Sequence, residues 1–502
     1  MKIKASLLVA AMSIAIVAPA HAQVLERTGM TTPQRLVVEA AAHHSSLGIF
    51  VEALNAAGPF LGPPVHGDAP PTLEHLDEIV LDFMDDNDLT GLTVSITREE
   101  RLVYTKSFGY RTMDFQQPLN TDHRLKLGSV SKIITTIAML KLLEQHPELD
   151  LDTPVFGFTH MGYDPGILDH PKWSAAMSLS SGSWSEFGQY QNITLRHLLS
   201  HASGFDKINE GQWDGQSIEA KEDYSLAFLA NCPLTSIPGT NCDYENQNLG
   251  LIGVVIEEVS GQTYEDYVRS NVLDPLGLDH ICTPGGDAQN AWRDAPMHVG
   301  DANSWDVVGI AFDPLKVKGY PAGGWLASSR DLVRLLCAID TSGGRPNILL
   351  PSSIAPMKTR QFSTASGAVR SIGWRINAAT EKIAHGGDLG GGHAYVGMFP
   401  ADSFSTAFPD TSEDYEVAPI NIAIAVNCDG SSSSLAGLSD SLALEVAQVN
   451  LAPSVDFFPT PWSTVSPVYA NASDQLAGET FGEQQIQMSE SAIEILTQPR
   501  SR

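Results

Sequence analysis

Ser129 and Lys132 are the residues whose types and spacing most directly suggest chemistry. They form the only Ser-x-x-Lys of the chain and stand at the head of a run with apolar residues at helical spacing: Ile133, Ile137, Leu140 and Leu143. A lysine one helical turn from a serine can take its proton, so that the hydroxyl attacks a carbonyl carbon without a histidine–aspartate relay. The amine must first lose its charge, which burial favours. The helix start also offers backbone N–H groups to a developing oxyanion.

Four segments follow one another along the chain: the Ser129 tetrapeptide, residues 193–204, Tyr244-Glu245-Asn246 and His385-Gly386-Gly387. In this order they resemble the serine β-lactamase and penicillin-binding-protein superfamily, in its branch of class C β-lactamases, D-peptidases and related esterases. Residues 274–278 and 323–326 resemble that branch too. The resemblance covers roughly residues 75–450, and four ordered motifs are far more specific than any one of them.

The resemblance implies a role for the tyrosine motif. Of the three Tyr-x-Asn elements, which begin at Tyr190, Tyr244 and Tyr469, only the second follows residues of the 193–204 type and leads into an apolar helix. The Tyr244 phenol is expected near Lys132, whose positive charge favours phenolate and lets the oxygen shuttle protons. Asn246 is expected to hydrogen-bond the carbonyl side of the substrate.

His385, Gly386 and Gly387 stand where the family has a Lys-Thr-Gly strand. Gly387 is expected to let the substrate lie against the strand edge. The backbone N–H of Asp388 is expected to join that of Ser129 as an oxyanion hole. Histidine in place of lysine removes a fixed positive charge at neutral pH, and Asp388 adds a negative one. Both departures argue against penicillin recognition and favour esters, neutral amides or peptides with a positive end.

The elements expected to position these residues are strands at both ends of the chain, with helices between them. Short β-like runs at residues 92–97 and 101–108 flank a charged turn, and residues 420–426 alternate as a half-buried strand does. Helical patterns, such as those at 195–199 and 249–259, fill the middle. We therefore expect one sheet built from both ends of the chain. Together with the resemblance, this predicts an α+β fold with an antiparallel sheet flanked by helices, and an inserted, mostly helical region (β-lactamase/transpeptidase-like).

The start of the chain has the pattern of a secretory signal, with two lysines, an apolar stretch and Ala20-His21-Ala22 before Gln23. We therefore expect the mature protein to be periplasmic or secreted. No later run approaches the ~20 apolar residues of a membrane span, so none is expected. The expected organisation is a signal peptide at 1–22, a proline-rich leader or linker at 23–72, the β-lactamase-like serine hydrolase domain at 73–450 and a C-terminal tail at 451–502.

The charge of the chain limits its partners. The sequence has 30 Lys and Arg against 59 Asp and Glu, a formal net charge of −29 at pH 7. Such a surface repels nucleic acid and anionic lipid. The expected partner is therefore a small-molecule or short-peptide substrate, with no nucleic acid, and the oligomeric state stays open.

No metal or other cofactor is expected. Five cysteines in a secreted chain allow disulfides without forming a metal-ligand spacing, and Cys232 and Cys242 are the pair best placed to bond. Cys337 and Cys428 lie in apolar contexts and are expected to be buried thiols. Two further candidates, His197 and His201, lie four residues apart on an expected helix. They lack the acidic partner of a zinc site, and the resemblance assigns them structural roles.

These residues predict a serine hydrolase that acts through an acyl-Ser129 intermediate on small amides or peptides, or on esters. A peptidase or amidase is favoured narrowly over a carboxylesterase. A β-lactamase or D,D-carboxypeptidase ranks third because of His385 and Asp388. The alternative from another class is a non-catalytic penicillin-binding or sensor module. The presence of Lys132 and Tyr244 argues against it, because binding alone needs no proton shuttle.

Overall fold

The computed structural model describes the part of the chain on which the fold and the site rest. The described residues are 63–112, 117–169, 189–205, 234–284, 294–301, 304–308, 320–341, 345–364, 367, 369–377, 380–401, 418–428 and 432–458. The predicted signal peptide, most of the predicted leader and the chain beyond residue 458 lie outside these ranges. The export of the protein therefore stays a prediction.

One compact unit runs from Val65 to Pro459, with the short stretch 114–116 excepted. It begins earlier than the predicted boundary at residue 73, because strand β1, Val65–Asp68, pairs with the edge of the sheet. It also ends later than the predicted boundary at residue 450. The backbone N–H of Phe457 donates to the Leu102 carbonyl at 2.9 Å, so the chain after residue 450 still packs on the sheet. The compact unit therefore extends several residues beyond the predicted domain at both ends.

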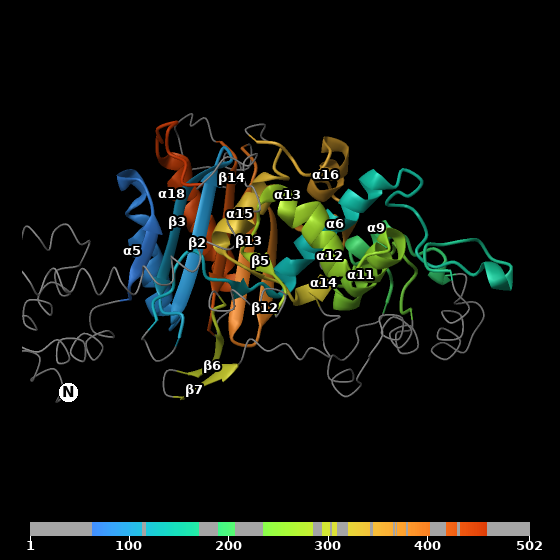
Figure 1. Cartoon of the computed structure of the whole chain (residues 1–502), viewed down its shortest axis with the longest axis horizontal. Coiled ribbons are helices and arrows are strands. Elements are labelled where there is room, and N and C mark those ends of the chain that lie inside the picture. Colours follow the sequence, from blue (N-terminus) through green and yellow to red (C-terminus); the bar gives the residue numbers. More distant parts are fainter. Residues whose placement is uncertain are drawn as a thin grey trace, which may run out of the picture. The chain divides into compact units, whose positions relative to one another are not determined.

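A nine-stranded antiparallel sheet forms the centre of this unit (Figure 1). Its strand order is β1-β3-β2-β14-β13-β12-β11-β10-β9, so strands from the two ends of the chain meet where β2 pairs with β14. The remaining strands are β2 Gly91–Arg98, β3 Arg101–Gly109, β9 Phe362–Ser363, β10 Val369–Arg370, β11 Arg375–Ile376, β12 Ile383–Leu389, β13 Gly392–Phe399 and β14 Ile420–Val426. Glu99 and Glu100, at φ +53° and +59°, form the two-residue turn between β2 and β3. Positive φ at both positions matches the twist of paired strands.

The central strands are buried on both faces, and the two faces differ in chemistry. In β2, Leu92, Val94 and Ile96 join an apolar cluster with helices α5, Leu76–Asp86, and α18, Ser432–Gln448. The alternate residues of β2 are hydroxylated and face helix α15, Ser329–Cys337. There the hydroxyl oxygens of Ser95 and Ser329 lie 2.9 Å apart. Because successive side chains of a strand point to opposite faces, the apolar side chains of β2 lie on one face of the sheet and its hydroxyl side chains on the other.

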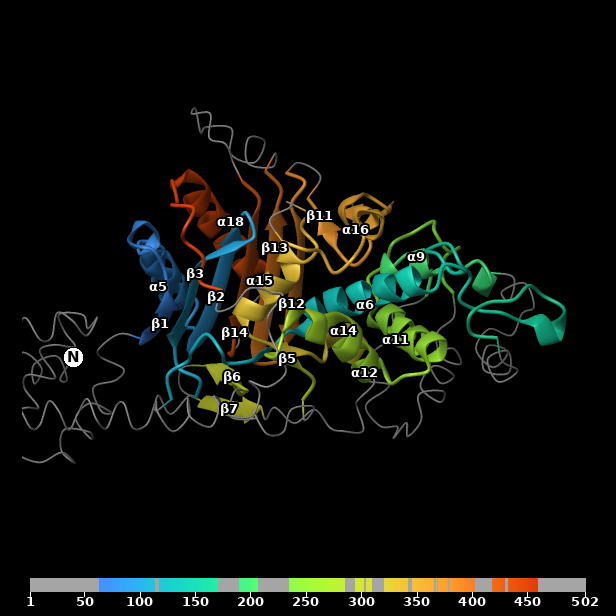
Figure 2. The same cartoon turned by 45° about the horizontal axis from the view of Figure 1, so that its top comes forward.

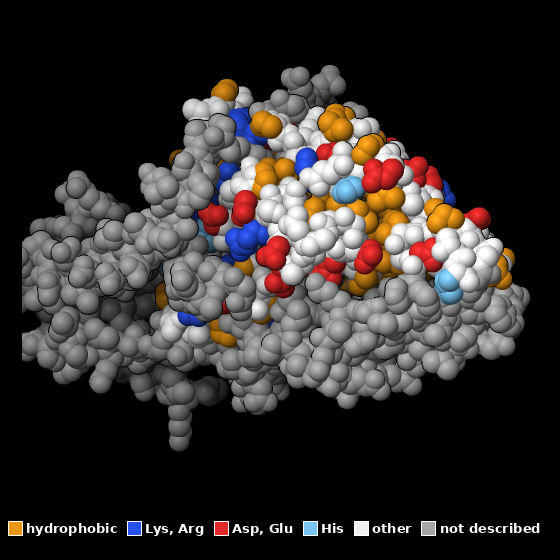
Figure 3. Space-filling model, turned by 45° about the vertical axis from the view of Figure 1, so that its right-hand side comes forward, with side chains coloured by type: hydrophobic (Ala, Val, Ile, Leu, Met, Phe, Trp, Pro, Cys, Tyr) orange, Lys and Arg blue, Asp and Glu red, His pale blue; other side chains and the backbone are white. Residues whose placement is uncertain are grey.

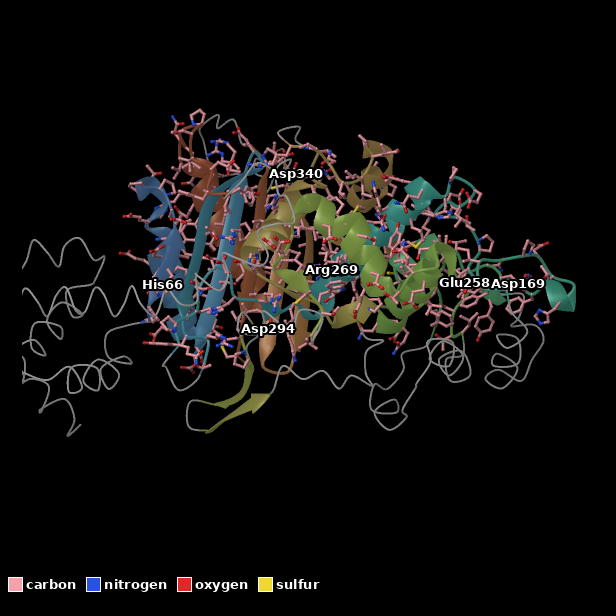
Figure 4. All side chains as sticks on the ribbon, viewed as in Figure 1. His66, Asp169, Glu258, Arg269, Asp294 and Asp340 are labelled. Carbon is pink, nitrogen blue, oxygen red and sulfur yellow. The ribbon has the colours of Figure 1, made fainter. Side chains whose placement is uncertain are left out.

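Strand β14 shows why a simple alternation was misleading. All seven of its residues are buried, so the prediction of a half-buried strand was wrong. The isoleucines face the apolar cluster, while the other face lies under α15. On that face the side-chain amide of Asn421 donates to the Asp340 carboxylate at 2.8 Å. Asp340 is labelled in Figure 4. Small and hydrogen-bonded residues are thus buried as fully as the isoleucines.

The inserted region between β3 and β9 is mostly helical, as predicted, and packs beside the sheet (Figure 2). Its helices are α6 Ser131–Gln145, α9 Leu195–Leu199, α11 Asn246–Ser260, α12 Tyr264–Val268, α13 Asp274–Leu276, α14 Tyr320–Gly323, α15 Ser329–Cys337 and α16 Pro351–Lys358. Its short strands are β4 Leu125–Lys126, β5 Ile281–Cys282, β6 Met297–Asp301, β7 Ser304–Val308 and β8 Leu326–Ala327. Single turns of 3-10 or π helix occur at Pro71–Leu73, Gly128–Val130, Thr159–Met161 and Arg269–Leu273. The predicted α+β architecture is therefore confirmed.

The surface reflects the acidic composition. On the face shown in Figure 3, acidic side chains lie among apolar ones over the described residues. No helix within the described ranges has both the length and the apolar character to cross a membrane. Basic side chains are therefore the minority among the charged residues of this protein.

The 3-10 turn η4, Gly128–Val130, lies directly against strand β12. A Cβ atom on Gly387 would lie 1.9 Å from the Leu127 carbonyl oxygen. A Cβ on Gly128, which has φ +50°, would lie 2.9 Å from the Asp388 backbone nitrogen. Gly387 is therefore required so that the strand can approach the turn, whereas the sequence had suggested that its size admits the substrate.

We predict that Gly387→Ala destabilises the protein. The added methyl group cannot fit between β12 and η4, and overpacking of this kind costs about 1–3 kcal/mol. Urea unfolding of the purified variant measures the loss. Gly390→Ala, in the adjacent β12–β13 turn, is the matched control because nothing lies within 4 Å of its Cβ position. Equal stability of the two variants would contradict the tight contact.

Candidate active site

Ser129 lies in turn η4, which leads into helix α6. Its Oγ accepts a hydrogen bond from Lys132 Nζ at 2.9 Å and another from the Tyr244 hydroxyl at 2.6 Å. Lys132 belongs to the first turn of α6, and Tyr244 lies just before α11. Two predicted motifs, more than a hundred residues apart in sequence, therefore place three reactive side chains at one point.

Lys132 is 1% exposed and has three oxygen acceptors around its amine. Besides Ser129, Nζ donates to Asn246 Oδ1 at 2.7 Å and to the Ala322 carbonyl at 2.6 Å. A protonated amine fills all three acceptors. A neutral amine gives its two hydrogens to Asn246 and Ala322 and directs its lone pair at Ser129, which is the arrangement of a general base.

This arrangement adds a role for Asn246 to its predicted contact with the substrate, which stays a prediction. Its carbonyl oxygen binds Lys132, so this end of the amide orients the lysine. The contact of Lys132 with the Ala322 carbonyl oxygen was not predicted. The sequence pointed only to the neighbouring segment 323–326, which contributed to the family resemblance.

The Tyr244 ring is held among cations and a histidine. Its centroid lies 4.9 Å from Lys132 Nζ, 5.2 Å from the guanidinium carbon of Arg370 and 4.4 Å from the His201 ring. Burial nevertheless raises the pKa of Tyr244 to about 12, although the hydrogen bond to Ser129 and the charges of Arg370 and Arg375 lower it. Tyr244 is therefore a neutral phenol at neutral pH, and the predicted bias toward phenolate was wrong. Desolvation outweighs the nearby positive charge.

The two histidines of residues 193–204, His197 and His201, lie in different parts of the structure and make different contacts. Helix α9 ends at Leu199, so His197 and His201 do not share one helix as expected. His197 completes a capping box, in which its Nδ1 accepts the Thr194 backbone N–H at 3.2 Å. His201, at φ +60°, stacks on Tyr244, and its Nδ1 accepts the Glu245 N–H at 3.1 Å. Sequence reasoning missed the contact of His201 with the site.

Strand β12 brings His385 beside Tyr244, with 6.2 Å between the ring centroids. His385 is 2% exposed, and its Nδ1 donates to the Gly386 carbonyl at 2.7 Å. Burial, followed by the charge of Lys132, lowers the pKa of His385 well below its usual value of 6.5. The imidazole is therefore neutral at neutral pH, in agreement with the expected absence of a fixed charge at this position.

The junction of β12 and η4 also brings together the two expected oxyanion donors. The Ser129 nitrogen lies 2.9 Å from the position of a Cβ on Gly387, and the Asp388 nitrogen lies equally close to a Cβ on Gly128. The Asp388 carboxylate itself is 59% exposed and accepts a hydrogen bond from His393 Nδ1 at 2.7 Å. The carboxylate is thus hydrogen-bonded to a histidine on β13.

The cysteines do not match the predicted disulfide. Cys242 is a free, buried thiol that donates to the Ser200 carbonyl at 3.1 Å, whereas Cys232 lies outside the described residues. The predicted pairing is therefore not found. Cys337 and Cys428 are buried free thiols, as predicted, and burial raises the pKa of Cys337. Within the described ranges, no group of three or more His, Cys, Asp or Glu side chains could hold a metal ion.

The fold and this set of side chains define the class of a serine hydrolase with a lysine base. A family model described as Beta-lactamase matches residues 76–447. The chain therefore belongs to the β-lactamase family, and the resemblance inferred from the four ordered motifs is confirmed.

Known relatives include both esterases and penicillin-binding proteins. Esterase EstB of Burkholderia gladioli is 25% identical over 371 residues, which are 65% of this chain and 86% of EstB. Penicillin-binding protein 4* of Bacillus subtilis (strain 168) is 28% identical over 183 residues, 36% of this chain and only 34% of that protein. The solved structure of EstCE1, a hydrolase with promiscuous acyltransferase activity, has a TM-score of 0.56 at 20% identity, over 74% of this chain and 98% of its own. That structural likeness shows the shared fold.

We predict that mild acid destabilises the protein through buried histidines whose pKa is lowered, above all His201 and His385. Burial lowers the pKa of His201 and of His385 well below 6.5, so below that pH the unfolded chain binds more protons than the folded one. Stability is then complete above pH 6.5 and falls as the pH drops, by up to about 1.4 kcal/mol per pH unit for each histidine.

Urea unfolding between pH 7.5 and pH 5 measures this slope. His385→Asn removes one of these groups and should make the slope shallower. His75→Asn, which replaces an exposed histidine at the start of α5, should leave it unchanged. The same slope in wild type and His385→Asn would contradict the assignment of a neutral, buried His385.

Proposed function

We propose that this protein is a carboxylesterase that forms an acyl-enzyme on Ser129. The observation that carries the proposal is the contact of Ser129 Oγ with both Lys132 and Tyr244, at 2.9 and 2.6 Å. A base and a proton relay that both contact one hydroxyl are what acyl transfer requires. A sensor module that only binds its ligand needs neither group.

Acylation begins when neutral Lys132 takes the Ser129 proton and Oγ attacks the ester carbonyl. The developing oxyanion lies between the backbone N–H groups of Ser129 and Asp388, where one such donor contributes about 3–4 kcal/mol. As the intermediate collapses, Tyr244 gives its phenolic proton to the departing alkoxide and regains one from Lys132. The alcohol leaves, and the acyl group stays on Oγ.

Deacylation uses the same groups in reverse. Lys132, neutral again, takes a proton from water through Tyr244, and the resulting hydroxide attacks the acyl carbon. The oxyanion forms at the same two N–H groups. Collapse returns the proton to Ser129 Oγ and releases the carboxylic acid. Each proton that leaves one oxygen thus arrives at another, and Lys132 and Tyr244 end in their starting states.

The choice of esters over amides rests on the relatives. The sequence had narrowly favoured a peptidase or amidase, but a relative matched over 86% of its own length is an esterase, EstB. An ester also demands less of the site, because an amide nitrogen must be protonated before it can leave, whereas an alkoxide can depart as an anion. A β-lactamase or D,D-carboxypeptidase stays the second candidate, supported by the partial match to penicillin-binding protein 4* and opposed by the neutral His385.

We predict that the purified protein turns over p-nitrophenyl esters faster than amino-acid amides or nitrocefin. Ser129→Ala should lower kcat on the esters by on the order of 10⁴–10⁶-fold, because removing a nucleophile from a catalytic unit costs this much. Steady-state assays of both proteins on the three substrate types measure it. Ester turnover by Ser129→Ala at the wild-type rate would overturn the mechanism. Acylation by nitrocefin without turnover, combined with no ester turnover, would point to a sensor.

A second prediction concerns the proton relay. Tyr244→Phe removes only the hydroxyl that donates to Ser129 and should lower kcat by about 10²–10⁴-fold, the usual contribution of a general acid–base group. Tyr190→Phe is the control, since it removes a hydroxyl from another buried Tyr-x-Asn tyrosine that packs against Phe156 and Phe205. If both variants keep wild-type kcat, Tyr244 is not the relay.

A further inference from the structure

The carbonyl group that binds Lys132 from the side of Ala322 belongs to a helix too short to be stable alone. Helix α14, Tyr320–Gly323, has four residues, and its Ala322 carbonyl oxygen accepts from Lys132 Nζ at 2.6 Å. A helix of this length closes too few internal hydrogen bonds to offset the loss of chain entropy. The direction of this acceptor therefore depends on the contacts of α14 with its neighbours, helices α6 and α11 (Figure 2).

A chain of buried hydrogen bonds connects α14 to helices α6 and α12. Thr135 Oγ1 of α6 lies 2.6 Å from the Pro321 carbonyl oxygen of α14 and 2.6 Å from the Tyr264 hydroxyl of α12. The Tyr264 hydroxyl also accepts from Trp325 Nε1 at 3.1 Å. Thr135 is 0% exposed, Trp325 2% and Tyr264 5%, so water does not compete for these bonds.

The chemistry of the four groups fixes the direction of this chain. An indole N–H only donates, and a carbonyl oxygen only accepts. Thr135 has a single hydroxyl hydrogen, which goes to the Pro321 carbonyl at 2.6 Å rather than to the Ser131 carbonyl at 3.4 Å. Tyr264 must then donate to Thr135 while it accepts from Trp325. Burial raises the pKa of Tyr264, so the phenol keeps the hydrogen that it donates.

Further contacts fix where the segment around α14 lies. The backbone N–H of Trp325 donates to Ser131 Oγ at 3.1 Å, and its carbonyl accepts the Leu127 N–H at 3.0 Å, on the two sides of turn η4. The Pro321 ring packs on α11, where a Cβ on Gly253 would lie 2.5 Å from Pro321 Cγ. Contacts with η4 and α11 thus set the place of α14, and the bond from Thr135 sets the direction of its carbonyl groups.

The direction of the Ala322 carbonyl decides where the lysine lone pair points. Consecutive carbonyl groups of a helix point along the same axis, so the bond to Pro321 also orients Ala322. Neutral Lys132 has two amine hydrogens, for which Asn246 Oδ1 and the Ala322 carbonyl are the acceptors. If the Ala322 carbonyl turned away, one hydrogen could point at Ser129 instead. The lone pair would then point elsewhere, and the amine could not take the hydroxyl proton.

We propose that Thr135 and Tyr264 are positioning residues for the general base. Their hydroxyl groups hold the Ala322 carbonyl toward the lysine and so keep its amine directed at Ser129. This inference rests on the proposed function, because it concerns the step in which Lys132 takes a proton. Both hydroxyls act through the backbone of α14. Their removal should therefore lower kcat and leave KM nearly unchanged, which a general loss of stability would not do.

The test measures kcat and KM on p-nitrophenyl butyrate for variants of these two residues. Thr135→Val keeps the shape of the side chain but removes the bond to Pro321, and should lower kcat about 100-fold. Tyr264→Phe leaves that bond and removes its support, so a loss of about tenfold is expected. Thr135→Ser keeps the hydroxyl and should keep most of the wild-type kcat. KM should change by less than about twofold in all three variants.

Tyr267→Phe is the matched control. The Tyr267 hydroxyl also connects α12 to α6, but it donates to Gln145 Oε1, at 2.8 Å, at the far end of α6. This variant should lose stability in urea unfolding as Tyr264→Phe does and keep the wild-type kcat. Equal kcat in Tyr264→Phe and Tyr267→Phe would overturn the positioning role while the esterase proposal stands.

The variants of Thr135 give an independent answer, which also decides the matter if circular dichroism shows that Tyr264→Phe does not fold. Equal kcat in Thr135→Val and Thr135→Ser would overturn the proposal, whereas a loss confined to Thr135→Val supports it. If the wild-type protein hydrolyses no ester, the positioning role and the esterase proposal are both overturned.

Discussion

The contact between strand β12 and the turn that holds Ser129 is the constraint on which the active site depends. It is possible because Gly387 has no side chain, so that the strand lies against the Leu127 carbonyl. The contact joins two parts of the fold with different origins. The strand belongs to a sheet assembled from both ends of the chain, whereas the turn opens the first helix of the inserted region. Moving either part by the width of a methyl group would separate the backbone N–H groups of Ser129 and Asp388.

Burial decides the charge of each group around the nucleophile. Tyr244 stays a phenol and both His201 and His385 stay neutral, since desolvation outweighs the charges nearby. The positive charge of the site is therefore left to lysine and arginine. Lys132 has three oxygen acceptors and can give up its charge without losing its orientation.

The sequence was most informative where the relevant geometry is local. Ser129 and Lys132 are one helical turn apart, so their contact follows from the helix itself, and the strands β2 and β3 follow from short apolar runs bounded by a turn. The pairing with Tyr244 needed the order of motifs. The contacts of Asn246 with Lys132 and of Gly387 with Leu127 were missed, because each depends on a neighbour that only the tertiary structure supplies. The edge strand β1 was missed because it has only four residues, one of them a glycine.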